Sequence, residues 1–349
     1  GYWESKSNLV KGLHLKAILD SLGTNCILTR THNTYNEIDG DGIPDEPGLT
    51  TRSYVANNNN ADCFFSIHSN AGEGVNYPLM IFHRGGSYDD WSGQLTTYKA
   101  ENERLCNVVN DVFNTSIYSN WVNYKGQTGT TNPGRVTADK DLLGYSLGVL
   151  RNLHGIGMLS EGGMHEHRPQ AHRLMNDDYC WLEAWYFAKS LMIYFDTEDR
   201  FVTGNVAGVV YDNHNIRQFS YDTDFTYLGR DKNDAINFAH VQLLDAQGNV
   251  VQERTTDKDY NGVYVFRNIT PGEYTVKVSH DKYYTEETKV TVVADEVTYQ
   301  DMPLCLKRTE PLTIVSYGPL GADSVAVSCA STVDFEFNYD IDEKAVEEG

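Results

Sequence analysis

Three residues whose side chains can bind a metal ion or carry a proton stand at the ends of predicted elements. Glu4 precedes the first predicted helix, His68 closes the apolar run 61–67, and Glu161 follows the apolar segment 158–160. Zinc hydrolases use such ligands, keep one coordination position open for water and add a carboxylate that moves a proton. Taken singly, each residue also fits a plainer explanation, a solvated or paired carboxylate or a hydrogen-bonded histidine. The chemistry therefore depends on whether the fold brings the three together.

Alternating helices and strands predict the domain that would position these residues. The expected elements are the helices 7–22, 50–56, 100–113 and 177–195 and the strands 25–29, 61–68, 79–82 and 158–160. This alternation predicts an α/β fold, a mostly parallel sheet with helices on both faces. Ligands bind beyond the carboxyl ends of parallel strands, which is where His68 and Glu161 stand.

The charge balance limits the classes of partner. The chain has 28 basic and 49 acidic residues and a formal net charge of -21, which argues against nucleic acid or an anionic membrane as the partner. No apolar run approaches the roughly 18 residues that a transmembrane segment requires. The six cysteines include no Cys-x-x-Cys pair, so neither a disulfide framework nor a thiolate metal site is indicated.

Five short segments form a more specific pattern. They are Glu4-Ser5-Lys6-Ser7-Asn8-Leu9, Leu28-Thr29-Arg30-Thr31, Arg52 with Ala56-Asn57, Ala61-Asp62 with Ser66-Ile67-His68-Ser69-Asn70, and Met158-Leu159-Ser160-Glu161-Gly162. In this order they resemble the zinc-dependent N-acetylmuramoyl-L-alanine amidases, over about the first 195 residues. The resemblance implies that Glu4 and His68 bind zinc and that Glu161 is the catalytic carboxylate. The reaction would be hydrolysis of the amide bond between the muramoyl lactyl group and L-alanine in peptidoglycan or muropeptides, in the cell envelope, periplasmic or extracellular.

One part of the family pattern is missing from the sequence. The family's first ligand is a histidine in an Asp-Pro-Gly-His-Gly segment that ends the first strand, and this chain has neither that segment nor a strand before Glu4. We expect Gly1 to lie just downstream of it. Because two ligands hold zinc poorly, we expect the polypeptide as written to be inactive or nearly so, whereas the parent protein would hydrolyse peptidoglycan. His32 and His83 each follow a predicted strand and are candidate substitutes.

Further residues are candidates for binding substrate. Arg151 precedes the strand 158–160, and its planar guanidinium suits a stem-peptide carboxylate, although an ordinary surface ion pair explains it equally well. His165 and His167 follow Glu161 and would bind substrate or steady a leaving group; a polar loop is the alternative. The long segment 114–147 would form a wall of the groove.

An acidic run offers a possible second metal site. Asp39, Asp41 and Asp45 alternate with other residues in a pattern that resembles calcium-binding loops. Glu37 stands where such loops place a further aspartate, and Gly48 where a closing glutamate is expected. A solvated acidic turn is the alternative, and a calcium titration followed by thermal shift would separate the two.

The sequence pattern changes after Asp199. Short β-rich segments, several of them separated by turns such as Gly248-Asn249 and Pro271-Gly272, predict an antiparallel sandwich. The segment 262–276 resembles the carboxypeptidase regulatory-like domain, for which we expect spacing, surface attachment or binding of an envelope partner. Two later strand-like runs predict the start of an Ig-like β domain. The predicted domains are 1–198 (amidase), 199–306 (sandwich) and 307–349 (incomplete β domain).

Two other functions remain open at this stage. The chain could be a non-catalytic cell-wall-binding or scaffold protein on a degenerate amidase fold, because the first histidine is missing. The regulatory-like domain also suggests a zinc carboxypeptidase, but the order of motifs in the first domain argues against it.

Overall fold

The structure is a computed structural model of the 349-residue chain. It describes residues 2–33, 47–71, 76–85, 98–118, 135–197, 200–217, 229–307, 314–318 and 334–337. Gly1–Cys305 form one compact unit and Leu306–Gly349 a second, and each is described by itself. Within the described ranges, no helix combines the length and the apolar character needed to cross a bilayer.

The sheet of the first region positions the candidate site. Its strands are β1 (Phe64–Asn70), β2 (Leu79–Phe82), β3 (Arg135–Ala138) and β4 (Gly157–Met164), in the order β1-β4-β2-β3. β1 is parallel to β4 and β2 is parallel to β3, whereas β2 is antiparallel to β4. The predicted mostly parallel sheet is confirmed. Because of the one antiparallel pairing, β2 ends at the opposite edge from β1 and β4.

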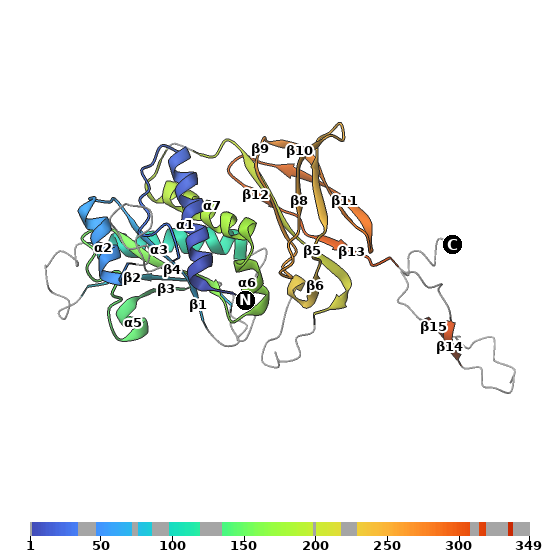
Figure 1. Cartoon of the computed structure of the whole chain (residues 1–349), viewed down its shortest axis with the longest axis horizontal. Coiled ribbons are helices and arrows are strands. Elements are labelled where there is room, and N and C mark those ends of the chain that lie inside the picture. Colours follow the sequence, from blue (N-terminus) through green and yellow to red (C-terminus); the bar gives the residue numbers. More distant parts are fainter. Residues whose placement is uncertain are drawn as a thin grey trace. The chain divides into compact units, whose positions relative to one another are not determined.

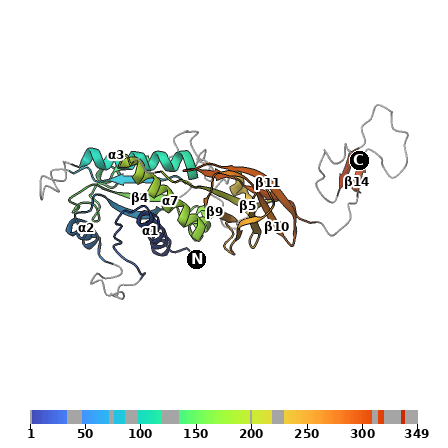
Figure 2. The ribbon, with the colours of Figure 1, turned by 90° about the horizontal axis from the view of Figure 1, so that it is seen from above.

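Helices cover both faces of this sheet, as predicted (Figures 1 and 2). They are α1 (Glu4–Ser21), α2 (Leu49–Asn58), α3 (Lys99–Phe113), α5 (Asp139–Leu143), α6 (Arg168–Leu174) and α7 (Asp177–Tyr194). Side chains alternate along a strand, so Met80 and Met158 join α1, α3 and α7 in one core cluster. Leu79 and Leu159 face the other way and pack in a second cluster with Ala56 of α2.

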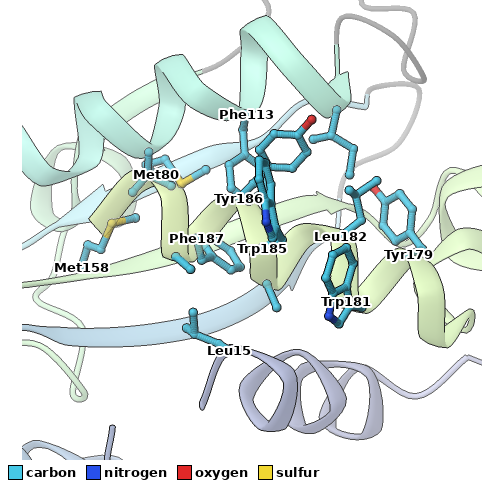
Figure 3. Close-up of a cluster of buried hydrophobic side chains, with 14 of the residues drawn as sticks. Leu15, Met80, Phe113, Met158, Tyr179, Trp181, Leu182, Trp185, Tyr186 and Phe187 are labelled. Atoms are coloured by element: carbon cyan, nitrogen blue, oxygen red, sulfur yellow. The ribbon is translucent and has the colours of Figure 1, made fainter. Parts of the chain in front are cut away.

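The aromatic helix α7 lies at the centre of the larger cluster. Figure 3 shows α7 between α3 and α1, with its aromatic side chains directed into the core. The ring of Phe187 lies 4.7 Å from that of Phe113 on α3, and the ring of Trp185 lies 4.9 Å from that of Phe201. A helix that is apolar on all sides is stable only when it is buried all round. This explains the run of Trp, Tyr, Phe and Leu in the predicted helix 177–195.

Some boundaries differ from the prediction. The first helix begins at Glu4 rather than at Ser7, so Glu4 is its first residue. The predicted strand 25–29 is wrong, since these residues are irregular backbone that lines a cleft beside β1 and pairs with no described strand. The cleft keeps residues 25–29 away from the backbone N–H and C=O groups of β1, with which a neighbouring strand would form hydrogen bonds. The predicted loop 114–147 contains the π-helix Asn114–Tyr118 and, after the undescribed residues 119–134, β3 and α5.

The second region is the predicted sandwich. Its strands are β5 (Gly204–Ile216), β6 (Asn233–Ala235), β7 (His240–Leu244), β8 (Val250–Thr255), β9 (Val263–Ile269), β10 (Gly272–His280), β11 (Tyr283–Val292), β12 (Val297–Tyr299) and β13 (Met302–Leu304), with the short 3-10 helix η2 (Gly229–Lys232) before β6. One sheet has the antiparallel order β11-β10-β7-β8, and the other is built around β5. Val206, Tyr264 and Val276 are among the residues of the core between them.

Gly208 in β5 lies very close to the backbone of another segment of the chain, and replacing it tests the packing of this sandwich. A Cβ atom there would overlap the backbone oxygen of Gln300 and lie 2.6 Å from Oη of Tyr264. Gly208→Ala is therefore expected to lower the free energy of unfolding by about 1–3 kcal/mol or more, the cost of overpacking. Urea denaturation measures it.

Gly12→Ala is the matched control, because the nearest atom to its Cβ would be a Leu28 methyl at 3.7 Å. Alanine within a helix should be neutral or stabilise by up to about 1 kcal/mol. Equal effects of the two substitutions would contradict the packing described for β5.

Contacts between α6 or α7 and the sandwich join the two regions of the first unit. Arg173 of α6 forms two hydrogen bonds with the carboxylate of Asp231, at 2.7 and 3.2 Å. Arg267 of β9 contacts Asp177 and Asp178 at the start of α7. Ala207 and Val265, among others, belong to the same core cluster as α7. The predicted boundary between residues 198 and 199 stays a prediction.

The described part of the second unit is residues 306–307 and one antiparallel pair of strands. The pair consists of β14 (Ile314–Gly318) and β15 (Asp334–Phe337), close to the two strand-like runs predicted there. The other features predicted for 307–349 fall almost entirely outside the described residues, so the Ig-like assignment stays a prediction.

Candidate active site

The start of α1 brings a carboxylate to the end of β1. Oε1 of Glu4 lies 3.0 Å from Nδ1 of His68, and the two side chains are 36% and 30% exposed. The same oxygen accepts hydrogen bonds from the backbone N–H of Ser69 at 3.1 Å and from the side-chain amide of Asn8 at 3.2 Å. Glu4 is thus held against His68 from both α1 and β1, and both side chains still reach solvent.

The environment of Glu4 keeps it ionised. Burial alone would raise the pKa of its carboxyl, but the hydrogen bonds from His68 and from the backbone of Ser69 outweigh this and lower the pKa to about 2. Its position in the first turn of α1 also favours a negative charge. At neutral pH Glu4 is a carboxylate, the form that binds a metal ion.

Glu161 lies beside His68 on the neighbouring strand. The two residues are register partners in the parallel pair β1 and β4, so their side chains project from the same face. Burial raises the pKa of Glu161 to about 7; the nearby His68 lowers it, and the nearby Glu4 raises it. A carboxyl that titrates near neutrality can accept a proton and give it back in one catalytic cycle.

The pair Glu4 and His68 fits two ligands of one zinc ion. Zn–N and Zn–O bonds of about 2.0 Å in a tetrahedron place ligand atoms about 3.3 Å apart, close to the observed 3.0 Å. No third His, Cys, Asp or Glu of the described residues completes a group that could hold a metal. Glu4 and His68 would therefore supply two of the four positions of a tetrahedral shell.

The first region of the chain matches a known protein family. The family model described as N-acetylmuramoyl-L-alanine amidase matches residues 1–188. The chain belongs to this family. The match spans α1, β1 and β4, and so includes Glu4, His68 and Glu161. A second family model, the carboxypeptidase regulatory-like domain, matches residues 230–304. The resemblance inferred from the sequence is confirmed for both regions.

Solved structures of amidases resemble the chain at low identity. The amidase AmiC2 of Nostoc punctiforme is 21% identical, with 55% of this chain and 84% of that chain covered and a TM-score of 0.39. The catalytic domain of CwlV from Bacillus (Paenibacillus) polymyxa var. colistinus is 21% identical, with 56% and 87% covered and a TM-score of 0.40. An amidase from Clostridium difficile 630 is 18% identical, with 56% and 86% covered and a TM-score of 0.41. None of the curated proteins compared with the chain matches it. Family membership rests on the family model.

Two histidines that follow Glu161 have different surroundings. Nδ1 of His165 lies 3.0 Å from the backbone oxygen of Ser69, and its ring stacks on Tyr2 with centroids 5.4 Å apart. His165 is therefore next to the site. His167 is buried, precedes α6 and has Nδ1 3.4 Å from the amide of Asn76. This setting favours the polar-loop explanation for His167, and the substrate role of His165 stays a prediction.

The expectation that His83 shares the rim of His68 is wrong. Because β2 is antiparallel to β4, Leu79 at its start pairs with Glu161, and His83 after its end lies at the opposite edge. There Nδ1 of His83 lies 2.9 Å from Oδ2 of Asp139, and both side chains are buried. The direction of β2 decides at which edge of the sheet His83 lies, and the sequence of β2 does not indicate whether the strand is parallel or antiparallel to its neighbour.

The remaining predicted site residues show no contact with Glu4, His68 or Glu161, or they lie outside the residues that the structure describes. His32 is exposed, with Nδ1 2.9 Å from Oγ1 of Thr31, and belongs to no metal-binding group of the described residues. Arg151 is exposed in the turn before β4, so its substrate role stays a prediction. The calcium candidates Asp39, Asp41 and Asp45 fall outside the described residues.

Sequence reasoning missed the polar residues beneath the site. Lys11 and Glu183 form an ion pair of 2.5 Å with both side chains fully buried. A signal existed, because the stripe Ser7, Lys11, Leu15 and Leu19 repeats every four residues, and all four are buried. A lysine on the buried stripe of an amphipathic helix requires a buried partner.

A cleft of about 750 Å³ runs beside Glu4 and His68 between α1, β1, α2 and the segment 24–30. Leu15, Leu28, Phe65 and Ile67 are among its lining residues. Arg30, Arg52 and Asp62 line it as well, so the cleft has both apolar and charged walls.

Proposed function

We propose that this protein is a zinc-dependent N-acetylmuramoyl-L-alanine amidase that hydrolyses the bond between the muramoyl lactyl group and L-alanine of peptidoglycan. The observation that carries the proposal is the convergence of Glu4, the first residue of α1, with His68 within β1 and Glu161 within β4. Membership of the amidase family supports it.

Each residue has a role that its geometry suits. Glu4 and His68 would hold the zinc ion, and the ion, when bound, would polarise the amide carbonyl and acidify a water molecule. Glu161, whose pKa burial raises to about 7, would take the proton from the water and pass it to the leaving amine of L-alanine. His165, next to Glu4 and Ser69, would contact the substrate.

A second candidate function is binding of the cell wall without catalysis. The observation in its favour is that only two metal ligands come together among the described residues. For either function we propose peptidoglycan as the partner and the cell envelope, periplasmic or extracellular, as the place of action. The sandwich would serve for spacing, attachment or contact with an envelope partner.

Zinc binding should depend on His68. We expect the protein to bind zinc weakly, since two protein ligands are described, and His68→Ala to weaken binding by about a hundredfold or more. Competition with a chromogenic chelator measures the affinity.

His240 is the matched control, because its Nε2 lies 3.2 Å from Oε2 of Glu253 in an exposed pair on the sandwich. His240→Ala should leave the zinc affinity unchanged. Equal losses in the two variants, or no loss in either, would remove His68 as a ligand.

Activity separates the two candidate functions. Purified peptidoglycan is incubated with the protein at rising zinc concentration, and newly exposed L-alanine amino groups are counted. We expect activity near background at low zinc and an increase once zinc fills the site. A site filled with zinc, as shown by the chelator assay, that releases no such amino groups would support wall binding instead.

A further inference from the structure

The buried ion pair of Lys11 and Glu183 lies next to the residues that follow His68 on β1 and Glu161 on β4. Nζ of Lys11 lies 3.4 Å from Oγ of Ser69, the residue after His68. A Cβ atom on Gly162, the residue after Glu161, would lie 3.3 Å from Oε2 of Glu183 and 3.5 Å from Nζ of Lys11. The ion pair thus contacts Ser69 after His68 and occupies the space beside Gly162 after Glu161.

The strands are irregular at this point. His68 is level with Glu161, but Asn70 is level with Met164, so β4 has one more residue than β1 over the interval. A bulge of this kind interrupts the backbone hydrogen bonds between the two strands and changes the direction of nearby side chains. The irregularity begins directly after His68 and Glu161, at the position where Lys11 contacts Ser69.

Ser69 transmits such a contact to Glu4. Its hydroxyl lies 3.4 Å from Oδ1 of Asn8, and its backbone N–H donates to Oε1 of Glu4 at 3.1 Å. Asn8 donates to the same oxygen at 3.2 Å. Lys11 lies on the same helix as Glu4 and Asn8 and is fixed by Glu183 of α7. A continuous set of polar contacts connects the ion pair to the carboxylate that faces His68.

Stability does not explain why this pair is charged. Replacing a fully buried ion pair by apolar side chains of similar volume is often neutral or stabilising, because the charges no longer lose their hydration. Where such pairs are useful, they specify one arrangement among several. A purely apolar contact at this position would remove the hydrogen bond from Lys11 to the Ser69 hydroxyl and leave only its contact with Asn8.

We infer that Lys11 and Glu183 are positioning residues that fix Ser69 and the bulge beside it, and through Ser69 hold Glu4 against His68. The effect on zinc and on catalysis rests on the proposed function. The effect on Ser69 is independent of it.

The test is the double variant Lys11→Met/Glu183→Leu, which removes both charges and leaves neither unpaired. We expect a melting temperature equal to or above that of the parent, and exchange of the Ser69 amide hydrogen faster by about tenfold or more, measured by NMR. Exchange at Met80 in β2 should not change. Zinc affinity should fall by about 10–100-fold, the usual effect of removing a residue that supports a metal ligand.

The control is Arg173→Met/Asp231→Leu, which removes another buried ion pair, one with no contact to Ser69 in the structure. It should leave exchange at Ser69 and the zinc affinity as in the parent. The inference is overturned if the Lys11/Glu183 double variant keeps the parent's Ser69 exchange rate, or if both double variants raise it equally. A parent protein that binds no zinc would refute the proposed function, and the Ser69 exchange rate would still decide this inference.

Discussion

Glu161→Gln is expected to lower kcat by about 10²–10⁴-fold in the presence of saturating zinc, because the variant loses the group that accepts and returns the proton. Glutamine keeps the size of the side chain, and Glu161 is the register partner of His68 rather than a described ligand. Zinc affinity should therefore stay within a few-fold of the parent. Counting new L-alanine amino groups over time gives kcat, and the chelator assay gives the affinity.

Glu166→Gln provides the matched control for this prediction. Glu166 is exposed five positions further along the chain, so its replacement removes the same charge from the same segment without touching β4. Its kcat should equal that of the parent. If Glu161→Gln retained more than about a tenth of the activity, Glu161 would not be the proton carrier.

The second large effect concerns stability. Asp231→Ala should lower the free energy of unfolding by about 3–5 kcal/mol, because it leaves the Arg173 guanidinium buried without its carboxylate. The two side chains are 3% and 6% exposed and share hydrogen bonds of 2.7 and 3.2 Å. Urea denaturation with a fluorescence readout measures the loss.

An exposed ion pair gives the comparison for Asp231. Arg84 and Asp141 lie in contact with their side chains 42% and 53% exposed, so Asp141→Ala should cost no more than about 1 kcal/mol. Because Arg173 is in α6 and Asp231 is in η2 before β6, the Asp231 variant also tests whether the sandwich stabilises the amidase region. A loss as small as that of Asp141→Ala would show that this contact contributes no more to stability than an exposed ion pair.

Local patterns in the sequence determined most of the elements. The strand 79–82 was predicted with its observed bounds, and the helices 100–113 and 177–195 each differ by one residue. Apolar spacing and turn residues are local properties, so neighbours in the sequence suffice to read them. The order of short motifs likewise determined the family, since it needs no knowledge of contacts.

Only the tertiary structure decided which residues meet. The antiparallel course of β2 removed His83 from the rim, and the cleft beside β1 left the segment 25–29 outside the sheet. Strand direction and pairing depend on segments far apart in the chain, and no local pattern encodes them.

The same reason applies to the site itself. The sequence offered Glu4, His68 and Glu161 as separate candidates, and the structure set Glu4 3.0 Å from His68 and His68 level with Glu161. The partner of Lys11 is Glu183, 172 positions further along the chain, at 2.5 Å. A charged residue on the apolar stripe of a predicted helix indicates, from the sequence alone, that it has a buried partner. The choice of that partner is made by the packing of α1 against α7, which is a property of the folded chain.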